Sequence, residues 1–182
     1  MKVLMIFADG FEDVEAIATR DVLVRAGIEV YDAKLSNDNQ IVVSSHKMSL
    51  SGFKSLKNIN TKEFNALVLP GGSRGVNNLL KSEEVDKVVL DFYRAHKLVC
   101  AICAAPMVLA KNGLLKNRRF TCYPGCEIGL DGLYTGEELV ITNNIVTARS
   151  MLYSIPFGLK IVELLLDIST SERVYKQIAG LK

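Results

Sequence analysis

Cys103 is the residue of this sequence with the clearest potential for chemistry. The apolar run Leu98 to Ile102 predicts a buried strand before it, and the small residues Ala104 and Ala105 follow it, ahead of Pro106. A strand that leads directly into a helix would place the sulfur at a sharp turn, as in a nucleophile elbow. A thiol there faces a helix N-terminus, which favours the thiolate. The competing interpretation is an inert, buried core cysteine.

Gly71 and Gly72 end a second apolar run, Ala66 to Leu69. Ligands of open α/β sheets bind beyond the carboxyl ends of the strands, so this glycine pair and Cys103 are expected to face one crevice. Together with the N–H group of Ala104, the backbone N–H of Gly72 would form an oxyanion hole. A plain Pro-Gly-Gly turn is the alternative, because this motif alone is a weak signal.

Glu15 falls early in the first predicted helix, just after the turn that ends the first strand. A carboxyl buried against the thiol would have a raised pKa, and it would then stay protonated and donate to the thiolate. Most glutamates on helices are instead solvated, which is the alternative here.

Histidines are scarce, and this limits the chemistry. The chain has only His46 and His96, and neither falls at a strand end beside Cys103, so a conventional Cys–His pair has no evident base. Cys122 and Cys126 have no histidine at ligand spacing, so we expect no metal site and no cofactor.

Strands alternate with helices along the chain, which predicts an α/β fold: a mostly parallel sheet with helices on both faces. We expect one domain over residues 1–182. The first helix is predicted with an apolar stripe of Val14, Ile17, Ala18 and Val22. The predicted strands are 3–7, 28–31, 66–69, 98–102, 119–123, 139–142 and 145–148, with short strands in 41–51, and the predicted helices are 12–26, 83–96, 104–111, 155–167 and 172–179.

Composition and charge restrict the partners. The net charge of +2 gives no electrostatic reason to expect nucleic acid. No secretory signal and no apolar stretch long enough to span a bilayer is evident, so we expect a cytoplasmic protein with free thiols.

Three segments in register resemble the ThiJ/PfpI superfamily. They are Phe7 to Glu15, Val68 to Gly72 and Ala101 to Pro106. The likeness is greatest to the branch that contains deglycases and oxidative-stress proteins, one of them linked to familial parkinsonism. It implies a flavodoxin-like three-layer sandwich and a homodimer.

The resemblance also implies roles for single residues. Cys103 would be the nucleophile, Glu15 the protonated partner of its thiolate, and Gly72 and Ala104 the oxyanion donors. Gly71, Tyr123 and His46 are further candidates for substrate binding. Tyr123 stands where the branch often has a histidine, and tyrosine is a poor base at neutral pH. His46 would approach the site of a neighbouring subunit if the dimer is that of the family.

The activity that the resemblance implies is that of a cofactor-free glyoxalase or deglycase. Its substrates would be reactive α-oxoaldehydes, methylglyoxal and glyoxal, or early glycated protein. An oxidative-stress sensor or chaperone, with Cys103 oxidised to a sulfinate, is the alternative. A cysteine peptidase or amidase-like hydrolase is disfavoured, because it needs the Cys–His pair that Tyr123 interrupts.

Overall fold

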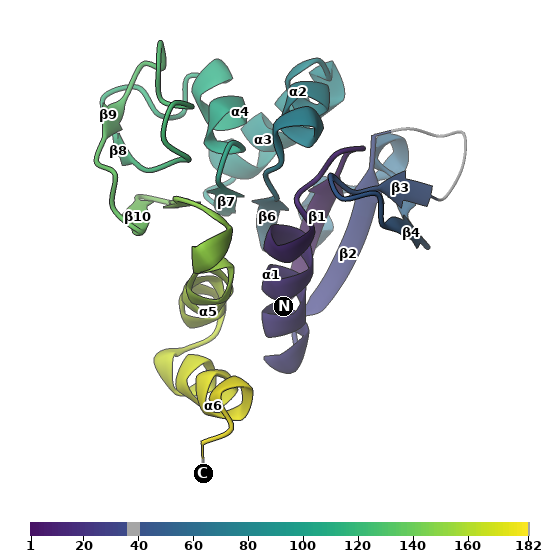
Figure 1. The fold of residues 1–182 in the computed structure, drawn as a ribbon, viewed down its shortest axis with the longest axis vertical. Helices are drawn as coiled ribbons and strands as arrows, with labels where there is room; N and C mark the ends of the chain where they lie inside the picture. The colour runs from purple at the N-terminus through teal and green to yellow at the C-terminus, as the bar shows by residue number, and fades with distance from the viewer. Residues whose placement is uncertain (36–40, 182) are drawn as a thin grey trace.

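A seven-stranded, mostly parallel sheet forms the centre of the molecule (Figure 1). The computed structural model describes residues 1–35 and 41–181. Six strands run parallel, and only the edge strand β10 is antiparallel to its neighbour. In spatial order the strands are β10 (Leu139–Thr142), β11 (Ile145–Ala148), β7 (Leu98–Ile102), β6 (Ala66–Leu69), β1 (Lys2–Phe7), β2 (Glu29–Lys34) and β5 (Lys54–Ser55).

Helices cover both faces of this sheet, which gives the three layers expected of the fold. Side chains of a strand alternate between faces, so Leu4 and Ile6 of β1 join one buried cluster while Val3 and Met5 join the other. The first cluster is covered by α2 (Ser73–Leu80), α3 (Glu83–Arg94) and α4 (Pro106–Lys111), and the second by α1 (Asp13–Arg25), α5 (Ser154–Leu165) and α6 (Ile168–Ala179).

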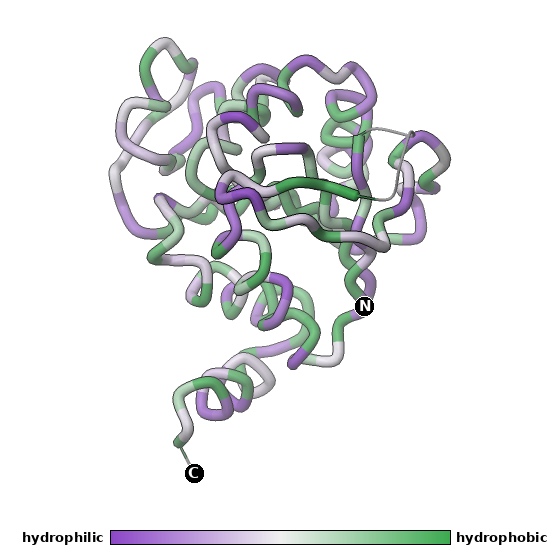
Figure 2. Tube along the Cα trace, turned by 45° about the vertical axis from the view of Figure 1, so that its right-hand side comes forward, coloured by the Kyte–Doolittle hydropathy of each residue, from purple (hydrophilic) through white to green (hydrophobic). Residues whose placement is uncertain are grey.

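Smaller elements surround the sheet. An antiparallel hairpin joins β3 (Ile41–Val43) to β4 (Ser49–Ser51), and a parallel pair joins β8 (Arg119–Phe120) to β9 (Leu133–Tyr134). Helix α6 packs on α5 and lies at the lower end of the molecule, where its hydrophilic and hydrophobic residues alternate (Figure 2). Short 3-10 helices occupy Leu56–Asn58, Thr61–Glu63 and Met151–Tyr153. None of the helices in the described ranges is long and apolar enough to cross a membrane.

The predicted apolar stripe of α1 was wrong. Val14 and Ile17 are 45% and 42% exposed, whereas Val22 is buried as expected. The buried face instead carries Glu15, Ala16, Thr19, Val22 and Leu23. Apolar residues lie all round this helix, so periodicity alone did not identify the face that meets the sheet.

Other boundaries were partly right. The strands at 66–69, 98–102, 139–142 and 145–148 are confirmed. Ser82 caps α3, and its Oγ accepts from the N–H of Val85. The strand predicted at 119–123 ends at Phe120. The last helix begins at Ile168 rather than Glu172, because Asp167 accepts the Thr170 N–H and caps it. Helix α2 had not been predicted.

Candidate active site

Cys103 occupies a strained turn directly after β7, which confirms the predicted elbow. Its φ angle is +63°, in the left-handed region that residues other than glycine rarely adopt. Two backbone hydrogen bonds hold it there: its N–H donates to the carbonyl of Ala148 at 2.9 Å, and its carbonyl accepts from the N–H of Tyr123 at 2.8 Å. The turn is therefore fixed by two neighbouring segments, and the sulfur is half-buried.

The Glu15 side chain is fully buried and reaches the same place from α1. Its Oε2 accepts the backbone N–H of Gly71 at 2.8 Å. Its Oε1 is also buried, but no group in the described residues forms a hydrogen bond of good geometry with it. Such an oxygen is costly as part of a carboxylate, and it is better satisfied as an O–H that donates to a neighbour.

Glu12 positions Glu15, a role that the sequence reasoning missed. Oε2 of Glu12 accepts the N–H of Glu15 at 2.7 Å and caps α1, while the N–H of Glu12 donates to the carbonyl of Gly71 at 3.0 Å. The first turn of α1 is thereby attached to the glycine loop. The acidic residue three positions before Glu15 was the available signal for this cap.

Positions 71 and 72 must be glycine because neighbouring atoms occupy the space that a Cβ atom would need. A methyl group at Gly71 would lie 2.4 Å from Oε2 of Glu15, 2.8 Å from Cβ of Cys103 and 2.9 Å from the carbonyl oxygen of Ile102. Both functional side chains therefore converge over this glycine. Gly72 has a φ of +90°, and a methyl group there would meet the backbone of the β1–α1 loop.

The surroundings shift the pKa values of both Glu15 and Cys103. Burial raises the pKa of the Glu15 carboxyl from 4.5 to about 7; the Cys103 thiol and the Gly71 N–H lower it, and the charge of Glu12 raises it. Burial also raises the pKa of the Cys103 thiol, and a charged Glu15 raises it further, whereas the backbone N–H groups of Gly72 and Ala104 lower it. The two groups lie in direct contact, so they titrate as one coupled pair.

The expected contribution of a helix N-terminus to the thiolate is not what the structure shows. Helix α4 is only six residues long, and it begins at Pro106 rather than at Ala104. The groups that favour a negative sulfur are instead the two backbone N–H donors of Gly72 and Ala104.

The remaining candidates lie at different distances from this centre. Tyr123 contacts the elbow through its backbone, and its side chain is half-exposed. His46 lies in the loop between β3 and β4, where its Nδ1 is 2.8 Å from Oδ2 of Asp13. His96 precedes β7, at the end of the sheet opposite Cys103, as expected.

The four cysteines are free thiols in the structure. Cys100 and Cys122 are buried, whereas Cys103 and Cys126 are partly accessible. One group of potential metal ligands occurs in the described ranges, formed by Glu12, Asp13 and His46. The sequence prediction had considered only cysteines and their spacing to histidine.

Comparison with known proteins is consistent with this geometry. The model of the DJ-1/PfpI family matches residues 1–164. Protein dj-1beta of Drosophila melanogaster is 34% identical over 181 residues, which cover 98% of this chain and 95% of that protein. A deglycase of Pyrococcus horikoshii is 34% identical over 152 residues, covering 82% of this chain and 90% of its own length.

Solved structures agree over nearly the whole chain. The crystal structure of Drosophila melanogaster DJ-1beta superposes with a TM-score of 0.93 at 33% identity, covering 98% of this chain and 97% of that one. The structure of oxidized Toxoplasma gondii DJ-1 gives a TM-score of 0.91 at 28% identity, with 98% and 97% coverage.

Proposed function

The chain belongs to the DJ-1/PfpI family, and we propose that it is a cysteine-dependent enzyme of the glyoxalase or deglycase type. Its substrates would be α-oxoaldehydes such as methylglyoxal and glyoxal, or their early adducts on proteins. The observation that carries this proposal is the buried Glu15 carboxyl, which has one oxygen without a partner beside the elbow of Cys103. Relatives named as deglycases support it.

Within the pair, we assign the proton to Glu15 and the negative charge to Cys103. The backbone N–H groups of Gly72 and Ala104 lower the pKa of the Cys103 thiol, whereas a Glu15 carboxylate would have only the N–H of Gly71. A protonated Oε1 would donate to the sulfur, which satisfies the oxygen that otherwise lacks a partner. The pair then holds one proton and one charge, with every polar atom satisfied.

The proposed reaction begins with addition of the Cys103 thiolate to the aldehyde carbon of methylglyoxal. A C–S bond forms, and the carbonyl oxygen becomes an oxyanion that accepts the Glu15 proton, giving a hemithioacetal. The N–H groups of Gly72 and Ala104, which interact with the sulfur, would stabilise the oxyanion.

Glu15, now a carboxylate, would remove the proton from the former aldehyde carbon and return it at the ketone carbon, while the hydroxyl proton of the hemithioacetal moves to the former ketone oxygen. The aldehyde carbon is thereby oxidised to a thioester while the ketone carbon is reduced to an alcohol, so no external oxidant is consumed. Water then cleaves the thioester, releasing lactate and the Cys103 thiol.

Turnover of methylglyoxal tests the proposal. Lactate formation should vanish in Cys103→Ala and fall at least about a hundredfold in Glu15→Gln, since general acid–base groups contribute at least that factor. Cys126→Ala is the matched control, because it removes the other partly accessible thiol. Turnover that survives in Cys103→Ala would refute the proposal.

An oxidation sensor is the second candidate function. It is favoured by exposure: Cys103 is partly accessible while Cys100 and Cys122 are buried, and the same Glu15 O–H would hydrogen-bond a sulfinate oxygen. After mild treatment with peroxide, mass spectrometry should find two added oxygens on Cys103 before any other cysteine. Earlier oxidation of Cys122 or Cys126 would argue against this function.

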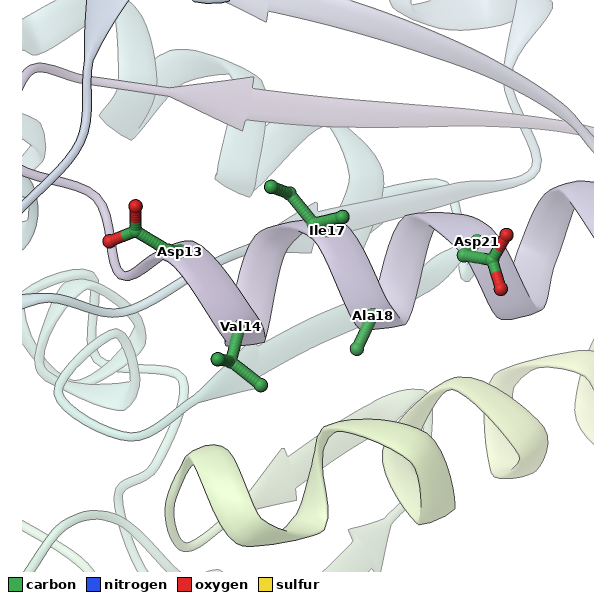
Figure 3. Close-up of a pocket in the computed structure, with 5 residues that line it drawn as sticks. All are labelled: Asp13, Val14, Ile17, Ala18 and Asp21. Carbon is green, nitrogen blue, oxygen red and sulfur yellow. The ribbon is translucent and has the colours of Figure 1, made fainter. Parts of the chain in front are cut away.

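We also propose that a second copy of the chain covers the exposed face of α1, which would give the homodimer that the resemblance implies. Asp13, Val14, Ile17, Ala18 and Asp21 line a shallow pocket of about 370 Å³ along this helix (Figure 3). Ile17→Glu should then convert a dimer to a monomer in light scattering, whereas Leu152→Glu, at another exposed apolar residue, should leave the mass unchanged. A monomeric wild-type protein would contradict this assignment.

A further inference from the structure

We propose that Glu12, Asp13 and His46 form a binding site for a divalent transition-metal ion at the start of α1. One potential ligand atom of each residue lies within 4.8 Å of the others. Two are carboxylates and one is an imidazole, a donor set that suits borderline ions such as Co²⁺, Ni²⁺ and Zn²⁺.

The backbone holds the two segments of this site together without the ion. Glu12 and Asp13 begin α1, whereas His46 belongs to the loop between β3 and β4. The N–H of Gly10 donates to the carbonyl of Val43 at 2.7 Å, and the N–H of Ser45 donates to the carbonyl of Phe11 at 2.8 Å. The ligands are therefore preorganised, and binding requires only side-chain rotation.

Distances within the cluster match an octahedral coordination shell. Nδ1 of His46, Oδ2 of Asp13 and Oγ of Ser45 form a triangle with sides of 2.8, 3.0 and 3.1 Å. Neighbouring ligands of an octahedral ion with bonds near 2.1 Å lie about 3.0 Å apart. This triangle can thus supply one face of the shell, with Glu12 and water on the other positions.

The site carries negative charge that no lysine or arginine offsets within the described residues. In the structure Asp13 pairs only with His46, and neither Glu12 nor Asp13 lies within salt-bridge distance of a cationic lysine or arginine there. Partial burial raises the pKa of Asp13, but hydrogen bonds from Ser44, His46 and Ser45 outweigh it and hold the value at about 2. The carboxylate is therefore ionised throughout the neutral range.

Binding of Co²⁺ tests the site, because its spectrum separates oxygen and nitrogen ligands from thiolates. Calorimetry should show one ion per chain, with affinity reduced about tenfold or more in His46→Ala. His96→Ala, which removes the only other histidine, is the matched control and should bind like the wild type. Equal affinity in His46→Ala, or thiolate charge-transfer bands in the bound spectrum, would overturn the proposal.

Failure of cobalt binding leaves the turnover of methylglyoxal unaffected, so the two proposals can fail independently.

Discussion

In a Cys103→Ala background, Glu15→Gln should remove a pH-dependent loss of stability that the Glu15 carboxyl imposes. The pKa of Glu15 is about 7 in the folded protein and 4.5 ordinarily, so between these values the folded state retains a proton that the unfolded state has lost. The stability that the neutral Glu15 carboxyl contributes is therefore fully present below pH 4.5, and it is lost as the pH rises through 7. At about 1.4 kcal/mol per pKa unit, the total decline is about 3 kcal/mol.

The pair Cys103→Ala and Cys103→Ala/Glu15→Gln isolates this effect, because it removes the coupled titration of the thiol. The chain has no tryptophan, so urea unfolding is followed by circular dichroism at several pH values from 5 to 9. The free energies of unfolding should differ least at pH 5, and between pH 5 and pH 8 the double variant should gain about 2.5 kcal/mol relative to the single variant. Parallel pH profiles of the two variants would refute a buried, neutral Glu15.

Three further outcomes follow from packing and capping. Gly71→Ala should abolish turnover while the fold persists in circular dichroism, because its methyl group would meet both Glu15 and Cys103; wild-type turnover would show a looser site. Phe157→Ala, at a fully buried ring, should lower the free energy of urea unfolding by about 3–5 kcal/mol. Ser82→Ala should lower the free energy of unfolding by about 1 kcal/mol in the same titration, since it removes the N-cap of α3. An unchanged free energy of unfolding in Phe157→Ala or Ser82→Ala would contradict the observed contacts.

The elements that were predicted correctly are those whose sequence pattern is typical of a single kind of secondary structure. β6 and β7 are short, fully apolar runs between turn residues, and such runs are buried on both faces of a parallel sheet. β10 and β11 form a hairpin around Asn143 and Asn144, a turn pair that favours hairpins, and Asn143 adopts a positive φ.

The errors arose where tertiary contacts override local preference. Helix α2 contains glycine and asparagines, which are poor helix formers, and it is stabilised by the burial of Val76 and Leu79. The face of α1 was misassigned because one of its sides must deliver a glutamate, Glu15, to the buried site. Hydrophobic periodicity cannot anticipate a buried carboxyl.

For the site, the sequence indicated which residues converge but not the balance of charges among them. Cys103, Glu15 and Gly71 follow three neighbouring strands, so their proximity follows from the topology. The degree of burial, and hence the raised pKa of Glu15, depends on side chains from both layers of the fold. The orientation of Glu12 toward Glu15 depends on the same tertiary contacts.

The central claim is that Glu15 holds the proton and Cys103 the charge. The direct test is the ultraviolet absorbance of the thiolate as a function of pH, measured as wild type minus Cys103→Ala. If Cys103 carries the first charge of the coupled pair, the thiolate should form well below the free-thiol value of about 8.5. A thiolate that forms only above the free-thiol value of about 8.5 would place the first charge on Glu15 and contradict the account.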